Sequence, residues 1–169
     1  MRNKYIAFAV LVVLLLAGFW VYGSKNTNYL SPFELSPTAT PHHRVVVKIG
    51  EWEVDAILSQ TQAEMSRGLG GVESLGENEG MLFDFTASNP PTAFWMKDMI
   101  IPIDIIWIKD GIIIQIDANA VPQPEVADSQ LKLYPPIDRS VEYVLEVNAG
   151  YSEIHNISIG DVFVIVSQE

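Results

Sequence analysis

The sequence predicts an α+β protein that is mostly β: a compact, partly open barrel-like domain of antiparallel and mixed strands with two short helices, behind one N-terminal transmembrane helix. Three observations predict it. An uncharged apolar run occupies residues 5–22, and many short apolar or alternating segments bounded by Gly, Pro and Asn follow residue 43. Only two short segments favour helix, and 169 residues leave room for a single domain of about 100–200 residues.

The apolar run predicts a membrane anchor over residues 1–23. At about 1.5 Å per residue, the uncharged residues 5–22 span roughly 27 Å, close to a hydrocarbon core of about 30 Å. Arg2 and Lys4 precede the run, which favours a cytoplasmic N-terminus, and Trp20 lies where an interfacial aromatic belt would hold the far end. The domain is therefore expected on the extracytoplasmic side, with the membrane contacted through residues 5–22.

A cleaved signal peptide is the alternative. Its apolar region is usually about 7–15 residues long and ends at a small-residue site, for which Gly23 and Ser24 are the nearest candidates. Cleavage would make the domain secreted on the same side of the membrane. Residues 24–43 mix Ser, Thr and Pro without a period and predict a flexible tether, which leaves residues 44–169 as the globular domain.

The strands and helices of the domain are predicted from apolar patterns and from the turn residues between them. Residues 44–49 and 52–58 predict a hairpin, and Thr61 with Glu64 predicts a capping box that opens a short helix to residue 66 or 67. Further strands are expected at residues 80–85, 92–97, 103–108, 112–116, 141–147 and 161–166, a second helix at 149–155, and a long irregular connection at 117–140.

The run 103–108 is nearly all apolar, which indicates a strand that is buried on both faces. Asp104 lies inside this run. A buried carboxylate needs partners, so Asp104 is a position that requires an explanation.

Charge and cysteine content exclude several functions. Residues 44–169 hold seven of the ten Lys and Arg and twenty of the twenty-one Asp and Glu, a net charge of −13. Such a surface repels phosphate backbones, so nucleic acid is not expected as a partner. The chain has no Cys, which removes disulfides and thiolate chemistry, and no spacing typical of a metal or cofactor site, so neither is expected.

Six blocks carry a family resemblance. They are Arg67–Leu69, Glu79–Phe83, Phe94–Lys97, Ile101–Ile105, Tyr143–Gly150 and Gly160-Asp161. In order and spacing they resemble the prokaryotic family known as domain of unknown function 192, over roughly residues 44–167. The resemblance implies a compact, mostly-β α+β fold and no established activity. Relatives commonly have Met and then Arg where this chain has Gly70 and Val72.

Five residues inside these blocks form the candidate ligand-binding site: Arg67, Trp95, Lys97, Asp104 and Glu146. A Lys and two carboxylates around an aromatic floor can orient a small polar ligand or a sugar, or act as acid and base if burial shifts their pKa values. The alternative is a structural ion pair between Lys97 or Arg67 and one of the carboxylates, because an unpaired buried charge is costly.

Two functions are compatible with these residues. The first is an extracytoplasmic module of the cell envelope that binds a small polar ligand, a glycan or an envelope protein without catalysis. The alternative is an envelope hydrolase acting on a saccharide-type substrate, with Asp104 and Glu146 as the catalytic carboxylates.

Overall fold

The computed structural model describes residues 43–90 and 92–168. The expected anchor at 1–23, and all but the last residue of the expected tether, lie outside the described residues. Within them, no helix is both long enough and apolar enough to cross a membrane. Residues 41–169 form a compact unit of their own.

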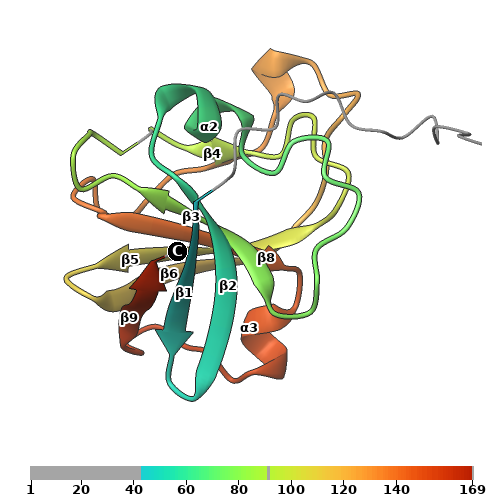
Figure 1. The fold of residues 1–169 in the computed structure, drawn as a ribbon. Coiled ribbons are helices and arrows are strands. Elements are labelled where there is room, and N and C mark those ends of the chain that lie inside the picture. Colours follow the sequence, from blue (N-terminus) through green and yellow to red (C-terminus); the bar gives the residue numbers. More distant parts are fainter. Residues whose placement is uncertain (1–42, 91, 169) are drawn as a thin grey trace, which may run out of the picture. The chain divides into compact units, whose positions relative to one another are not determined.

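A curled sheet of seven strands forms the body of the domain (Figure 1), with the order β6-β5-β8-β3-β2-β1-β9. Its strands are β1 (Arg44–Ile49), β2 (Trp52–Ser59), β3 (Glu79–Asp84), β5 (Ile103–Lys109), β6 (Ile112–Ala120), β8 (Tyr143–Asn148) and β9 (Phe163–Gln168). Neighbouring strands are antiparallel, except that β2 and β3 run parallel. The sheet curls into a half-barrel. At one point its two edges meet, where an isolated bridge links Ile112 of β6 to Val162, the residue before β9.

The remaining elements are short. They are the helices α2 (Gln62–Arg67) and α3 (Tyr151–Ile154), the 3-10 turn η1 (Asp128–Gln130), and the strands β4 (Phe94–Trp95) and β7 (Leu133–Tyr134). The strands β4 and β7 pair in a separate two-stranded sheet.

Local sequence explains both predicted hairpins, which the structure confirms. Between β5 and β6, Asp110 and Gly111 have φ angles of 52° and 70°. Positive φ at both central positions defines the hairpin turn that Asp-Gly favours. Between β1 and β2, Gly50 supplies the positive φ of 58° that the turn requires.

The connection expected at 117–140 is more ordered than predicted. Strand β6 continues to Ala120, and η1 and β7 follow. The strand expected at 92–97 is conversely reduced to the two residues of β4, which among the described residues pairs only with the equally short β7.

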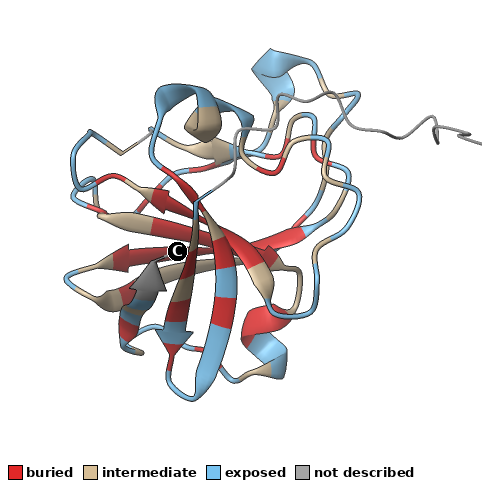
Figure 2. Cartoon of the chain, viewed as in Figure 1, coloured by how far each residue is buried: buried red, intermediate tan, exposed pale blue. Residues whose placement is uncertain are grey.

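Two apolar cores lie on the two faces of the large sheet. Figure 2 shows the buried residues along its strands. The first contains residues from all seven strands and fills the inside of the curl. The second lies on the outer face, under residues of β4, β7 and the turn after α2. Residues 103–108 are all buried, which confirms that strand β5 is covered on both faces.

Candidate ligand-binding site

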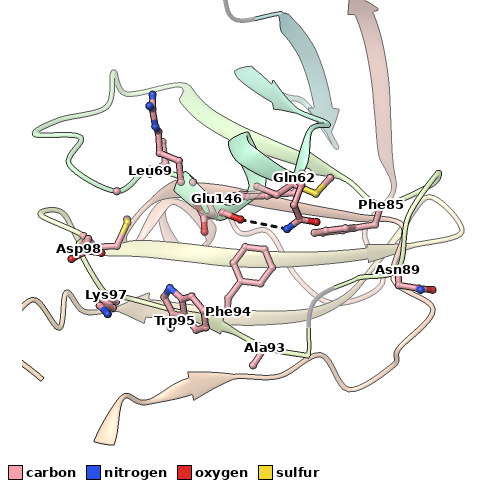
Figure 3. Close-up of a pocket in the computed structure, with 17 residues that line it drawn as sticks. Gln62, Leu69, Phe85, Asn89, Ala93, Phe94, Trp95, Lys97, Asp98 and Glu146 are labelled. Atoms are coloured by element: carbon pink, nitrogen blue, oxygen red, sulfur yellow. Dashed lines mark hydrogen bonds between the residues drawn. The ribbon is translucent and has the colours of Figure 1, made fainter. Parts of the chain in front are cut away.

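A cavity of about 470 Å³ opens between α2 and β4 on the outer side of the sheet (Figure 3). We call it the Glu146 cavity. It is lined by Gln62, Met65, Ser66, Arg67, Gly68, Leu69, Gly70, Phe83, Phe85, Asn89, Ala93, Phe94, Trp95, Lys97, Asp98, Met99 and Glu146. Figure 3 shows Gln62 and Glu146 on one side and Phe94 and Trp95 on the facing side.

Helix α2 forms one wall of the cavity, and hydrogen bonds at its two ends hold it in place. The Thr61 hydroxyl accepts a hydrogen bond from Glu64 N at 3.3 Å, and Glu64 Oε2 accepts one from Thr61 N at 2.9 Å, which is the predicted capping box. The helix ends at Gly68. Just beyond it, Gly71 N donates to Asp98 O at 3.0 Å, which ties the turn after α2 to the segment after β4.

Glu146 contributes a buried carboxyl to the cavity. In β8 it is paired with Met81 of β3 on one side and Ile105 of β5 on the other, so its flanking neighbours are apolar. Its side chain is only 5% exposed, and Oε2 is buried without a hydrogen-bond partner among the described residues. Burial raises the pKa of Glu146 to about 8, because the charged form loses its hydration. At neutral pH this carboxyl is therefore mostly protonated and can donate a hydrogen bond.

Aromatic rings make the facing wall. Phe94 packs edge-on against Phe83, with ring centroids 5.0 Å apart, and against Trp107 at 5.2 Å. These contacts fix the Phe94 ring from behind. Trp95, the next residue, is 55% exposed and offers an open indole face.

The basic residues at the mouth differ in their partners. Lys97 Nζ donates a hydrogen bond of 2.7 Å to Asp128 Oδ1, and this bond raises the pKa of Lys97. Arg67 is exposed at the end of α2 and makes no ion pair or side-chain hydrogen bond with any residue that the structure describes. Neither basic residue pairs with Asp104 or Glu146, so the structural ion pair considered from the sequence does not form.

Asp104 does not line the cavity. Asp104 is opposite Val147 and Glu146 is opposite Ile105, and successive residues of a strand point to opposite faces, so the two carboxyls lie on opposite faces of the sheet. Asp104 is fully buried and accepts three backbone hydrogen bonds, from Asn119 N at 2.8 Å, Gly150 N at 3.0 Å and Ser152 N at 2.9 Å. Its oxygens are thus used to fix the start of α3, and this placement argues against a catalytic pair with Glu146.

The structure therefore brings together Arg67, Trp95, Lys97 and Glu146 and separates Asp104 from them. Sequence reasoning missed Gln62, Phe85 and Met99 as lining residues, and Asp128 as the partner of Lys97. Only Phe85 carried a signal, because it shares a strand face with Met81 and Phe83. Among the described residues, no three or more His, Cys, Asp or Glu side chains gather in a way that could hold a metal ion.

The sequence profile of DUF192, described as an uncharacterized ACR, matches residues 45–165. The chain belongs to the DUF192 family. A crystal structure of a protein of unknown function from Novosphingobium aromaticivorans is similar at 30% identity, with a TM-score of 0.66 over 77% of this chain and 90% of that one. A putative transcription regulator from Sinorhizobium meliloti is also similar, at 30% identity, with a TM-score of 0.59 over 73% and 92% of the two chains.

No curated protein matches this DUF192 chain. The two solved relatives are covered almost completely by a part of this chain that is about the size of its globular domain. Residues 41–169, which form a compact unit of their own, are therefore the part of the chain chosen for the experiments below.

Proposed function

We propose that this DUF192 domain is a non-catalytic module of the cell envelope that binds a small ligand in the Glu146 cavity. One observation carries the proposal: a nearly buried carboxyl whose Oε2 has no hydrogen-bond partner among the described residues, in the wall of a cavity of about 470 Å³. Buried polar groups in proteins are almost always hydrogen-bonded. A polar group that lacks a hydrogen-bond partner and faces a cavity of ligand size can form that hydrogen bond with a ligand.

Catalysis is not part of the proposal, because the cavity offers no acid–base pair. Its carboxyls are Glu146 in the wall and Asp98 at the mouth, and Figure 3 shows Asp98 beside Lys97 rather than beside Glu146. Regulation of transcription, the role named for the Sinorhizobium meliloti relative, is not favoured either. A domain with a net charge of −13 repels the phosphate backbone.

The envelope location of the proposal rests on the N-terminal sequence. An uncharged run of eighteen residues after Arg2 and Lys4 is long enough to hold the domain at the outer face of a membrane. A binding module held there would meet small molecules that enter the envelope from outside.

A thermal-shift screen of residues 41–169 tests ligand binding. The panel contains sugars, amino acids, organic acids and amines. We expect at least one class to raise the melting temperature in the wild-type domain, because a ligand that binds only the folded state stabilises it.

Two tryptophan variants localise the effect. Ala93→Trp places a large side chain in the cavity and should abolish the shift, whereas Ala127→Trp, an exposed position outside the cavity, should leave it intact. If no compound stabilises the domain, or if Ala93→Trp responds like Ala127→Trp, the proposed function is wrong.

A further inference from the structure

The charges at the mouth of the Glu146 cavity favour one kind of ligand. Arg67 and Lys97 both line the cavity, and Asp98 is the one acidic residue that lines it with them at the mouth. Asp128 already neutralises Lys97 at 2.7 Å, which leaves the Arg67 guanidinium without a counterion among the described residues. In a domain that is otherwise acidic, an unpaired arginine beside a cavity is available to an anion from solution.

The inner part of the cavity favours a flat apolar body. Phe83, Phe85, Phe94 and Trp95 contribute rings to the lining, and Met65 and Met99 contribute thioethers. Phe94 is held edge-on between Phe83 and Trp107 and so presents a fixed surface. Rings and thioethers attract the faces and edges of an aromatic or other flat ligand.

Glu146 adds one polar contact within these apolar walls. Its flanking residues in the sheet, Met81 and Ile105, carry no charge, and the charged groups that face the cavity from the other elements are Arg67 on α2 and Lys97 and Asp98 after β4. None of them forms an ion pair with Glu146. The carboxyl is therefore held in its neutral form at pH 7, in which it donates a hydrogen bond to an acceptor atom of the ligand.

We propose that the ligand is a small organic acid with a flat ring: its carboxylate binds Arg67, its ring lies against Phe94 and Trp95, and an oxygen on the ring meets Glu146. This inference rests on the proposed function and names the ligand class for the same cavity. An organic amine is disfavoured, because it would have to pass two basic side chains and would then meet a neutral acid.

Four matched compounds test this assignment on residues 41–169 by isothermal titration. They are 4-hydroxyphenylacetate, its neutral amide 4-hydroxyphenylacetamide, the amine tyramine, and phenylacetate, which lacks the ring hydroxyl. We expect the hydroxy acid to bind at least about tenfold more tightly than the amide or the amine, since a charge-assisted bond to arginine contributes more than a neutral one. Phenylacetate should bind more weakly than the hydroxy acid, because Glu146 then lacks its acceptor.

Variants separate the two polar contacts. Arg67→Gln should remove the preference for the acid over the amide, whereas Arg139→Gln, at an exposed arginine outside the cavity, should leave that preference intact. Glu146→Gln retains a donor and should still bind the acid.

The affinity for the hydroxy acid should also fall as pH rises. As pH rises from 7 to 9, Glu146 loses the proton that it donates, and the affinity of the wild-type domain should fall by about tenfold. In Glu146→Gln the affinity should stay constant over that range.

The outcomes distinguish the two proposals. If tyramine binds more tightly than the acid, or if Arg67→Gln leaves the preference for the acid intact, the organic-acid assignment is overturned while the binding function stands. The organic-acid assignment is also overturned, and the binding function stands, if none of the four compounds binds while other compounds bind the wild-type domain but not Ala93→Trp. If nothing binds at all, the proposed function fails as well.

Discussion

Two buried acids of this domain illustrate opposite ways to keep a carboxyl inside a protein. Asp104 accepts three backbone hydrogen bonds, so its oxygens have partners that take the place of water. Glu146 is flanked in the sheet by Met81 and Ile105 and keeps its proton instead. The first arrangement stabilises the fold, whereas the second leaves a polar group free for another molecule.

Glu146 should make stability fall as pH rises. The pKa of this group increases from 4.5 to about 8 on folding, so between these values the unfolded chain is ionised while the folded domain still holds the proton. The contribution is fully present below pH 4.5 and is lost as pH rises towards 8, a difference of about 3–5 kcal/mol.

Urea denaturation of the wild-type domain and Glu146→Gln across this pH range measures the effect. The variant should become more stable relative to the wild-type domain as pH rises. A constant difference in unfolding free energy between the two proteins would show that the Glu146 pKa is not raised.

Asp104→Ala should be strongly destabilising. It leaves three backbone N–H groups, those of Asn119, Gly150 and Ser152, without their acceptor, which should cost at least about 3 kcal/mol. Asp161→Ala is the matched control, because Asp161 Oδ2 accepts a single exposed backbone bond from Ser158 N at 2.8 Å and its loss should cost about 1 kcal/mol or less. Equal losses for the two variants in urea denaturation would contradict this explanation of Asp104.

At the scale of single residues, the sequence predicted that Asp104 needs hydrogen-bond partners but not which groups supply them. Its partners are backbone amides of remote segments, and backbone groups leave no trace in a sequence pattern. The pattern did place Arg67, Trp95, Lys97 and Glu146 in one candidate group. It could not show that Asp104 lies on the other face of the sheet, because that depends on the register of β5 against β8.

Among the elements, α2 is one whose boundaries were closely predicted. A capping box is a local signal, so Thr61 and Glu64 were sufficient to locate its start. Strands β4 and β7 are the opposite case. Two residues are too few to show a period of two, and their pairing joins segments about forty residues apart. The sequence therefore predicted a longer strand at 92–97 in place of β4 and an irregular connection at 117–140 in place of β7.

Thr61→Ala tests the role of α2 in framing the cavity. Loss of the hydroxyl should cost about 1 kcal/mol of unfolding free energy, because Glu64 N loses its capping acceptor. A helix without its cap should open more often, so amide hydrogen exchange of residues 62–71, which include Arg67, should also accelerate relative to strand β8. Unchanged exchange in α2 together with unchanged stability would contradict this role of the cap.

For the molecule as a whole, short-range patterns predicted the hairpins but not the order of the sheet. The parallel pairing of β2 with β3 and the placement of β8 between β5 and β3 depend on contacts that are distant in the chain. The closing contact between Ile112 and Val162 is of the same kind.

Membrane attachment belongs to this scale. In a bacterial host, the full chain should stay in the membrane fraction after a wash with high salt or alkaline carbonate, and protease added outside the cytoplasmic membrane should digest the domain. Residues 41–169 behind a cleavable secretion signal are the control and should be soluble in the periplasm. Recovery of the full chain in the soluble periplasm would indicate a cleaved signal, and protection from protease would place the domain in the cytoplasm.

The first and last strands of the domain are neighbours in the sheet, where Val45 lies opposite Gln168. A short linker between them would therefore close the polypeptide into a ring without disturbing β1 or β9. New ends could then be opened at the Asp110-Gly111 turn, away from the residues that line the Glu146 cavity. Circular permutation thus offers a route to attach a reporter or a surface at a chosen side of the domain while the Glu146 cavity stays intact.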